Sequence, residues 1–381
     1  MGPKKCKLFL FHAIISYMLD YSKLFDTARD LYALPSYNNK QGRALMPLRY
    51  FFELTYLCNL NCPYCYVGED RKKDELTTEE WFKIIDQIPF YSFVTLVGGE
   101  PLLRKDFIPI LERVAKKTFG KLNVVTNGIL INDEIIDAFI RTKMMLLSVS
   151  LDGYGENHDK NRGKEGIFDE IISNLDNLRS KSRKPMIDIK TIVLENNLDD
   201  LPKLYKLCDE MNFDFLSISF LRNNDLKQNS VLRETFGEEF YLQRYPIKPY
   251  FDMDHFKEIY REIESMRGKT KIRFAPKFDE KNILEQIETF FNYPEDKPIQ
   301  EVYEPCLYPY SNMMINPEGD IYPCLSLKIG NVRGKSLKEV LNKPKFCCFR
   351  KNLKYSKVFE ACQMCCELRV LEAKRQRRKD A

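Results

Sequence analysis

The chain has 381 residues, of which 44% are hydrophobic and 30% are charged. This composition is that of a folded globular protein and excludes a disordered one. Because a single core rarely extends far beyond about 150 residues, the length suggests two domains, or one large domain with an appendage. The formal charge of +5 is too small over this length to indicate a nucleic-acid partner.

Residues 1–47 are expected to form a helical extension without a catalytic signature. The apolar segment at 8–19 follows two lysines, but it contains His12, lacks an Ala-x-Ala cleavage pattern and is too short to span a bilayer. We expect an amphipathic helix that packs on the core, with contact to a membrane surface as the less common alternative. A loop containing Pro35, Asn38, Asn39 and Gly42 should follow.

From residue 49 onward, strand-like and helix-like segments alternate, which favours a parallel sheet covered by helices. The expected strands lie at 50–56, 92–97, 121–126, 144–151, 186–193 and 214–220. The expected helices lie at 77–88, 105–117, 131–142, 164–182, 198–211 and 252–267. Thr77 supplies an N-cap for the first helix, and Glu79 and Glu80 supply its acidic first turn. The fold class is therefore α/β.

The twelve cysteines are grouped in short spacings, which favours metal ligation in a reducing cytoplasm over a disulfide framework. Cys58, Cys62 and Cys65 form a C-x3-C-x2-C run after the first strand. A cubane cluster that only carries electrons takes four cysteine ligands, so three would leave one metal open to a substrate or cofactor. A zinc knuckle or a set of buried structural cysteines is the alternative.

Further motifs follow the next strands, and function in parallel α/β folds concentrates at such carboxyl ends. Gly98-Gly99-Glu100-Pro101 follows the second strand, Thr126-Asn127-Gly128 the third and Ser150-Leu151-Asp152 the fourth. The glycines could form an ordinary turn, or they could let the backbone approach a ligand while Glu100 accepts from an ammonium group. Asp152 could cap a turn, and Arg162 could form a surface ion pair.

Taken together, these motifs resemble the radical S-adenosylmethionine (SAM) enzymes. The resemblance implies a partial (β/α)6 barrel at 48–268, with a [4Fe-4S] cluster on Cys58, Cys62 and Cys65 whose free iron binds SAM. It also implies a set of SAM-binding residues, namely Tyr64, Gly98, Gly99, Glu100, Ser150, Asp152 and Arg162.

The polar segment at 223–229 breaks the alternation, and residues 269–304 are expected to connect the barrel to a second cysteine set across the barrel mouth. This set comprises Cys306, Cys324 and the pair Cys362-x2-Cys365, with a hairpin turn at 316–320. The pair alone would also suit a zinc ribbon.

In context, residues 305–370 resemble the SPASM extension of radical SAM enzymes, or its shorter twitch form. Only Cys366 follows the pair before a basic tail at 371–381, so the resemblance implies one auxiliary [4Fe-4S] cluster on Cys306, Cys324, Cys362 and Cys365. Three further cysteines could also ligate, namely Cys347, Cys348 and Cys366, whereas Cys6 and Cys208 are expected to be structural.

The resemblance implies that one electron cleaves SAM and that the resulting 5′-deoxyadenosyl radical abstracts hydrogen from a substrate carbon. Because cluster potentials reach about −700 mV, a ferredoxin or flavodoxin is the expected reductant. A peptide or protein side chain is the expected substrate. Dehydrogenation or epimerisation of a small alcohol, cyclitol or sugar is the alternative. A noncatalytic iron–sulfur electron carrier or a structural zinc protein is the hypothesis from another class.

Overall fold

The computed structural model describes residues 21–65, 74–221, 250–279, 281–292, 297–322, 324, 328–362 and 365–371, and gives only the backbone of residues 21–26 and 361. The helix expected at 8–19, the segment at 223–229, Cys6 and the basic tail beyond residue 371 lie outside this part of the chain. The described residues form one ten-stranded sheet in the order β10-β9-β8-β1-β2-β3-β4-β5-β6-β7.

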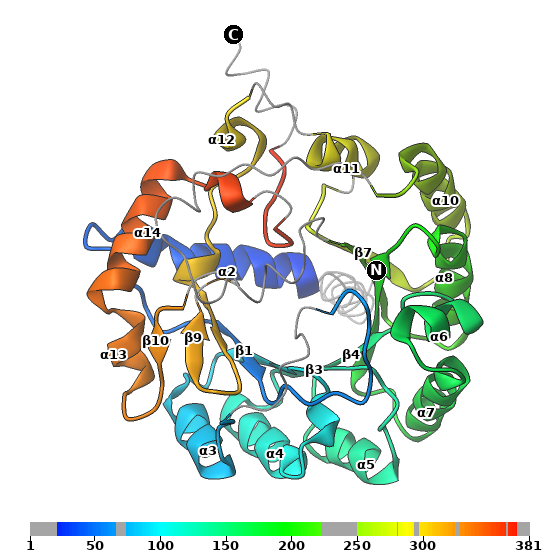
Figure 1. Ribbon diagram of the computed structural model, residues 1–381, viewed down its shortest axis with the longest axis horizontal. Coiled ribbons are helices and arrows are strands. Elements are labelled where there is room, and N and C mark those ends of the chain that lie inside the picture. Colours follow the sequence, from blue (N-terminus) through cyan, green and yellow to red (C-terminus); the bar gives the residue numbers. More distant parts are fainter. Residues whose placement is uncertain are drawn as a thin grey trace, which may run out of the picture.

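The strands from β1 to β7 are all parallel and curve into an open barrel (Figure 1). Their bounds are β1 Arg49–Glu53, β2 Phe93–Val97, β3 Leu122–Thr126, β4 Leu146–Ser150, β5 Met186–Val193, β6 Phe215–Phe220 and β7 Lys271–Ala275. All six strands expected from the sequence are present, within a few residues of the expected ends.

Helices cover the outside of this barrel, as the ring in Figure 1 shows. They are α3 Thr78–Gln87, α4 Phe107–Thr118, α5 Asp133–Arg141, α6 Glu156–Arg162, α7 Ile167–Lys181, α8 Leu201–Glu210 and α10 Met253–Ser265, with short 3-10 turns η1 Pro101–Leu103 and η2 Leu198–Asp200. The expected N-cap is confirmed, because the Thr77 side chain accepts from the Glu80 amide and Glu80 reaches back to the Thr77 amide.

The strands carry apolar side chains towards the helices and polar ones towards the barrel interior. Leu147, Ile189 and Leu216 are fully buried on the helix side. On the other face, Ser217 Oγ donates to Asp188 Oδ1 over 2.6 Å, and Ser148 Oγ lies 3.3 Å from Asp188 Oδ2. Since successive strand residues point to opposite faces, these polar residues define a polar interior that crosses from β4 to β6.

The segment at 269–304, expected as a connection, continues the barrel. It contains β7, which pairs with β6, followed by α11 Ile283–Phe291 and α12 Ile299–Val302. The β7 sequence alternates Lys271 and Arg273 with apolar residues, and it lies at the start of the stretch 269–305, which mixes charged residues with four prolines.

The C-terminal part joins the same sheet from the other side. β8 Asn312–Ile315 pairs in parallel with β1, and β9 Asp320–Tyr322 and β10 Gly330–Asn331 continue antiparallel. The hairpin turn expected at 316–320 is confirmed between β8 and β9. The remaining elements are η4 Tyr308–Tyr310, α13 Leu337–Leu341, α14 Pro344–Ser356 and η5 Glu360–Cys362.

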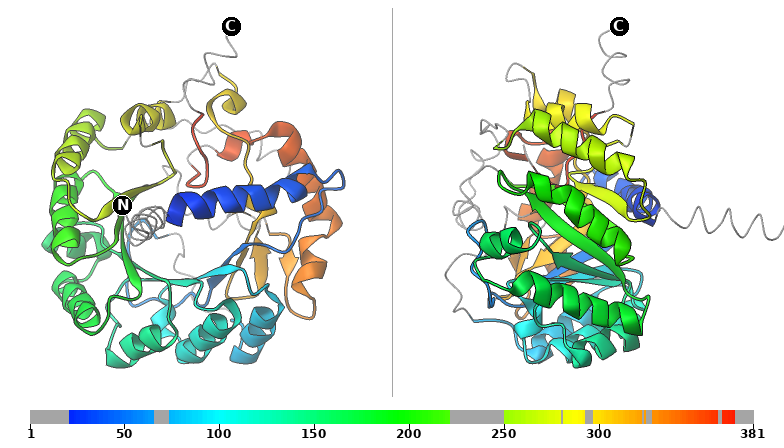
Figure 2. Two further views of the ribbon diagram at one scale, coloured as in Figure 1. Left: turned by 180° about the vertical axis from the view of Figure 1, so that it is seen from behind. Right: turned by 90° about the vertical axis from the view of Figure 1, so that its right-hand side faces the viewer.

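Helix α2 (Tyr21–Asn38) crosses the barrel at the amino ends of the strands, on the side away from the loop after β1 (Figure 2). Tyr32 donates to the carbonyl of Met46 just before β1, and Tyr37 packs edge-on against Tyr310 just before β8. The expectation that Pro35 lies in a loop is wrong, because it lies inside this helix. Among the described helices, none is both long enough and apolar enough to cross a membrane.

Candidate iron–sulfur and SAM site

Cys58, Cys62 and Cys65 lie in the loop after β1, and all three are half-buried. The Cys65 amide donates to the carbonyl of Cys62 over 3.1 Å, which folds the C-x2-C part into a tight turn. Leu60 anchors the loop in the core. Burial raises the pKa of Cys58 and of Cys62, so a positive charge or a metal is needed to hold either as a thiolate.

In the described part of the chain, no three cysteine, histidine or acidic side chains converge as a single metal ion would require. In a cubane each thiolate binds a different iron, so its ligands do not need to converge on one point. Three thiols in one short loop are therefore a donor set that fits an iron–sulfur cluster.

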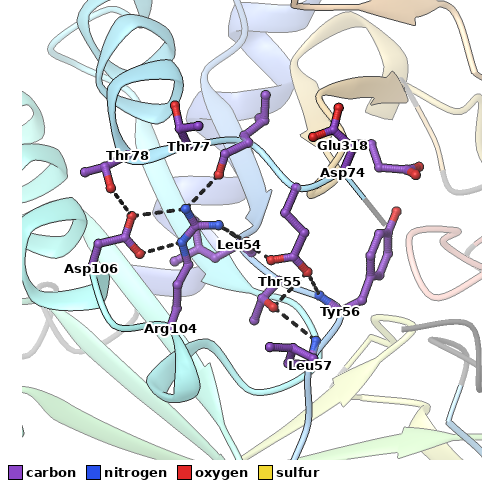
Figure 3. A network of polar contacts seen from close by, with 12 residues as sticks. Leu54, Thr55, Tyr56, Leu57, Asp74, Thr77, Thr78, Arg104, Asp106 and Glu318 are labelled. Atoms are coloured by element: carbon purple, nitrogen blue, oxygen red, sulfur yellow. Dashed lines mark hydrogen bonds and ion pairs between the residues drawn. The ribbon is translucent and has the colours of Figure 1, made fainter. Parts of the chain in front are cut away.

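Arg104 fixes the chain that leads into this loop (Figure 3). Its guanidinium donates to the carbonyls of Leu54 and Leu76, each over 2.7 Å, and pairs with Asp106 over 2.7 Å. Beside it, the carboxylate of Glu75 accepts from the Tyr56 amide over 2.7 Å and from the Thr55 hydroxyl over 2.9 Å.

These contacts join residues on both sides of the cysteine loop to the turn after β2. Hydrogen bonds from Arg104 and Thr78 outweigh burial and keep the pKa of Asp106 below its ordinary value. The carboxylate therefore stays charged and holds Arg104 in place. A ligand loop needs such support, because hydrogen bonds to the residues around metal ligands orient those ligands.

Glu100 is fully buried and joins the ends of β2 and β3. Its carboxylate accepts from the Asn127 amide over 2.7 Å, the Thr126 hydroxyl over 2.8 Å and the Leu102 amide over 3.1 Å. Burial raises its pKa to about 7 despite these bonds. In the described residues, Glu100 thus acts first as a brace for the loops around the site.

Gly98 and Gly99 pack directly on the cysteine loop's backbone. A Cβ at Gly98 would lie 2.5 Å from the Thr55 carbonyl oxygen, and one at Gly99 would lie 2.3 Å from that of Leu57. Gly98 also has φ +147°, a conformation that side chains with a Cβ rarely adopt. The glycines were expected to let the backbone approach a ligand closely. In the structure they let it approach the backbone of residues 55–57.

Tyr64, Asp152 and Arg162 form one buried group with Cys62. The Tyr64 hydroxyl donates to Asp152 Oδ2 over 2.7 Å, and Arg162 Nη2 lies 2.6 Å from the same oxygen. Arg162 Nη1 lies 3.7 Å from Cys62 Sγ. Burial lowers the pKa of Arg162, but Asp152 and the other neighbours raise it by more, so the guanidinium stays charged.

This group also contains polar atoms that suit a ligand. Arg162 Nε is buried and has no hydrogen-bond partner among the described residues. Ser150, at the end of β4, is half-buried and pairs in register with Lys190 of β5. An unsatisfied guanidinium donor beside the cysteine loop is suited to the carboxylate of a SAM molecule.

The second cysteine set comes from three chain segments. Cys306 leads into η4, Cys324 follows β9, and Cys362 ends η5. Burial raises the pKa of Cys306, and the nearby Cys362 and Cys324 raise it further. The Cys365 amide donates to the Cys362 carbonyl over 2.9 Å, as in the first C-x2-C turn.

Cys366 follows Cys365 directly and is half-buried, whereas the remaining described cysteines lie elsewhere. Cys347 and Cys348 lie on α14, where Cys347 Sγ contacts the Asn342 carbonyl at 3.5 Å and Cys348 is exposed. Cys208 is fully buried on α8, where burial raises its pKa. No disulfide forms among the cysteines that the structure describes.

A loop of three thiols at the carboxyl edge of an open parallel barrel, joined to a second cysteine set, defines the class of radical SAM enzymes with an added cluster domain. Residues 52–208 match the radical SAM superfamily, and residues 306–366 match the iron–sulfur cluster-binding domain SPASM. The resemblance drawn from the motifs is confirmed. The cofactors of such a protein are [4Fe-4S] clusters and SAM.

Curated relatives match about half of the chain. It is 31% identical over 186 residues to the Fe-coproporphyrin III synthase of Methanosarcina barkeri, covering 48% of this chain and 46% of the relative. It is 30% identical over 166 residues to the sporulation killing factor maturation protein SkfB of Bacillus subtilis, covering 43% of this chain and 40% of SkfB. In both cases the match spans less than half of the relative.

Solved structures match over more of the chain. Streptococcus suis SuiB aligns with a TM-score of 0.60 at 19% identity, covering 86% of this chain and 73% of that one. The structure of anSMEcpe with bound AdoMet aligns with a TM-score of 0.54 at 20% identity, covering 82% of this chain and 80% of that one. At these identities the likeness establishes the fold.

Proposed function

We propose that the chain cleaves SAM reductively at a cluster on Cys58, Cys62 and Cys65 and directs the resulting radical to a peptide or protein side chain. The observation that carries this proposal is the cysteine loop, whose entry and Cys62 are held by Arg104 and Arg162. When bound, the cluster supplies the electron that breaks a carbon–sulfur bond of SAM.

The chain's own residues hold and orient the two cofactors. Arg162 donates to Cys62 and offers its buried Nε to the SAM carboxylate. Asp152 keeps Arg162 and Tyr64 in fixed positions. We assign Ser150 to a hydroxyl of SAM. We assign Gly98, Gly99 and Glu100 to the methionine end of SAM, which Glu100 serves by holding the surrounding loops in position.

The barrel interior supports a polar substrate. Lys190 Nζ lies 3.7 Å from Asp188 Oδ2, and Lys190 stays partly exposed at the level of Ser150. Asp188 in turn accepts from Ser217. A charged, hydrogen-bonding interior of this kind suits the amides and side chains of a peptide, since an apolar substrate would leave these groups unsatisfied.

The comparisons support the same substrate class. SkfB is named a maturation protein, SuiB was crystallised with its precursor peptide SuiA, and anSMEcpe was crystallised with a peptide. The curated relatives also include synthases of heme and Fe-coproporphyrin. An iron porphyrin is therefore a necessary comparison substrate.

We assign Cys306, Cys324, Cys362 and Cys365 to one auxiliary [4Fe-4S] cluster within residues 305–370. Four protein ligands leave no open iron, so this cluster would accept an electron from the substrate radical. A ferredoxin or flavodoxin would reduce the cluster at the cysteine loop.

The test is deuterium transfer to 5′-deoxyadenosine. The anaerobically reconstituted full chain is incubated with SAM, dithionite and one of three probes: a perdeuterated peptide fraction, a perdeuterated small-metabolite fraction or Fe-coproporphyrin. Deuterium from the peptide fraction alone supports the proposal. Deuterium from the metabolite fraction alone, or turnover of the porphyrin alone, contradicts the peptide assignment while leaving SAM cleavage intact.

A further inference from the structure

The loops at the amino ends of the barrel strands combine exposed aromatic side chains with cations. This face lies opposite the cysteine loop, and α2 crosses it in the left view of Figure 2. Phe90 and Tyr91 precede β2, and Phe119 precedes β3. Phe90 is 61% exposed and Phe119 is 76% exposed.

These aromatic residues form one continuous patch. The rings of Phe90 and Phe119 lie 6.3 Å apart, those of Phe90 and Tyr91 lie 5.6 Å apart, and Tyr91 lies 6.0 Å from Tyr32 of α2. Lys121 Nζ lies 5.3 Å from the Phe119 ring centre. A large aromatic patch exposed on a protein surface marks an interaction site.

Cations lie along the same edge of the sheet as this patch. The exposed ones precede β3, β4, β5 and β7 in turn, and they are Lys116, Lys143, Arg183, Lys184, Arg267 and Lys269. Two acidic residues near this edge are engaged. Asp209 accepts from the amides of Lys269 and Thr270, and Asp214 pairs with Arg179.

Backbone strain points to the same surface. Phe119, Lys143 and Arg267 each follow a helix with φ between +47° and +54°, a left-handed conformation in which glycine is usual. All three side chains are exposed, and the Phe119 ring contacts Phe90 and Lys121 of the same face. Exposed side chains other than glycine at these left-handed helix ends carry a conformational cost, which is consistent with a function at the surface.

We propose that this amino-end face docks on an anionic lipid surface. Aromatic side chains placed among lysines and arginines are the chemistry that inserts at a lipid headgroup boundary, and the cations complement acidic headgroups. The barrel mouth with the cysteine loop would then face away from the lipid.

Flotation of the full chain with vesicles tests this assignment. Vesicles of phosphatidylcholine alone are compared with vesicles that contain about one third phosphatidylglycerol, at low and high salt. We expect binding only to the anionic vesicles, weakened by salt. Because each cation near an anionic surface strengthens binding about fivefold, Lys143→Gln/Arg183→Gln/Lys184→Gln should lower the partition coefficient on the order of 100-fold.

Matched variants separate docking from folding. Phe119→Gly should weaken vesicle binding while leaving the melting temperature unchanged or raising it, because glycine relieves the left-handed backbone. Lys338→Gln/Lys351→Gln and Tyr355→Ser alter exposed residues of α13 and α14 and should leave binding unchanged.

Four results would overturn the proposal. The first is that the protein does not bind anionic vesicles, and the second is that the α13 and α14 control variants lose vesicle binding equally. The third is that removal of residues 372–381 abolishes vesicle binding while changes to the amino-end face do not. The fourth is that this face binds a duplex RNA more tightly than it binds vesicles. A dimer that the Phe90→Ser/Phe119→Ser variant disrupts, without vesicle binding, would assign the face to a second copy instead.

Discussion

Replacing Arg162 with glutamine tests how the protein prepares the cluster thiolates. The substitution removes the donor 3.7 Å from Cys62 Sγ and the partner 2.6 Å from Asp152 Oδ2. A hydrogen bond to a charged acceptor contributes about 1.5 kcal/mol or more. The reduced cluster is the more negative state and gains more from the donor, so its loss should lower the midpoint potential, by up to about 60 mV if this energy is confined to the reduced state.

Stability should fall as well, because Asp152 is fully buried. Breaking a buried ion pair costs about 3–5 kcal/mol, and Asp152 keeps hydrogen bonds from the Tyr64 hydroxyl and the Ile192 amide, so we expect the lower end of that range. Arg179→Gln is the control, since it breaks the pair of a buried guanidinium with the part-exposed Asp214 at the other end of the barrel.

The assay is an EPR-monitored redox titration of the reconstituted protein, together with thermal denaturation. Arg162→Gln should shift the potential, Arg162→Lys should shift it less, and Arg179→Gln should change stability alone. A potential shift in Arg162→Gln no larger than that in Arg179→Gln would refute the role assigned to Arg162.

Three further predictions concern the brace, the buried histidine and the second cysteine set. Arg104→Gln should lower the free energy of unfolding by about 3 kcal/mol and reduce the iron content, because the carbonyls of Leu54 and Leu76 and the carboxylate of Asp106 lose a buried donor. In the same chemical denaturation, the exposed control Arg113→Gln should lower the free energy of unfolding by under about 1 kcal/mol. Burial lowers the pKa of His158 from 6.5 to about 3, so only the unfolded state gains a proton on this residue as pH falls below 6.5. Between pH 7 and pH 5 the free energy of unfolding of the wild type should therefore fall by about 2 kcal/mol through this residue. Urea titrations of His158→Asn should not show this loss. Cys306→Ala should halve the iron bound and leave measurable SAM cleavage without substrate turnover; unchanged iron would count against a second cluster.

The sequence predicted the barrel well where apolar runs alternate with amphipathic helices. β7 was missed because it lies in the stretch 269–305, whose charged residues and four prolines indicated a connection. The pairing of β8 with β1 could not be predicted either, because contact between segments so distant in the chain leaves no local periodicity. Such pairing places the second cysteine set on the same sheet as the first.

The sequence predicted the motifs of the candidate site but not the residues that hold these motifs in place. The spacing of Cys58, Cys62 and Cys65 together with the glycine-rich segment after the second strand predicted this site, because the two motifs agree in order along the chain. Glu75 belongs to no motif, and only its two hydrogen bonds to the chain before the loop reveal its role. Arg104 follows the glycine-rich segment by a few residues, and this proximity was the one available signal.

The most direct test of the central claim uses the Cys306→Ala/Cys362→Ala variant, in which only the cluster at the cysteine loop should remain. Its reduced EPR spectrum is recorded before and after SAM is added, and 5′-deoxyadenosine is measured in the same sample. We predict a changed spectrum and formation of 5′-deoxyadenosine, both lost when Cys58, Cys62 and Cys65 are also replaced. A loaded cluster whose spectrum ignores SAM, or 5′-deoxyadenosine formed without these three cysteines, would contradict the account.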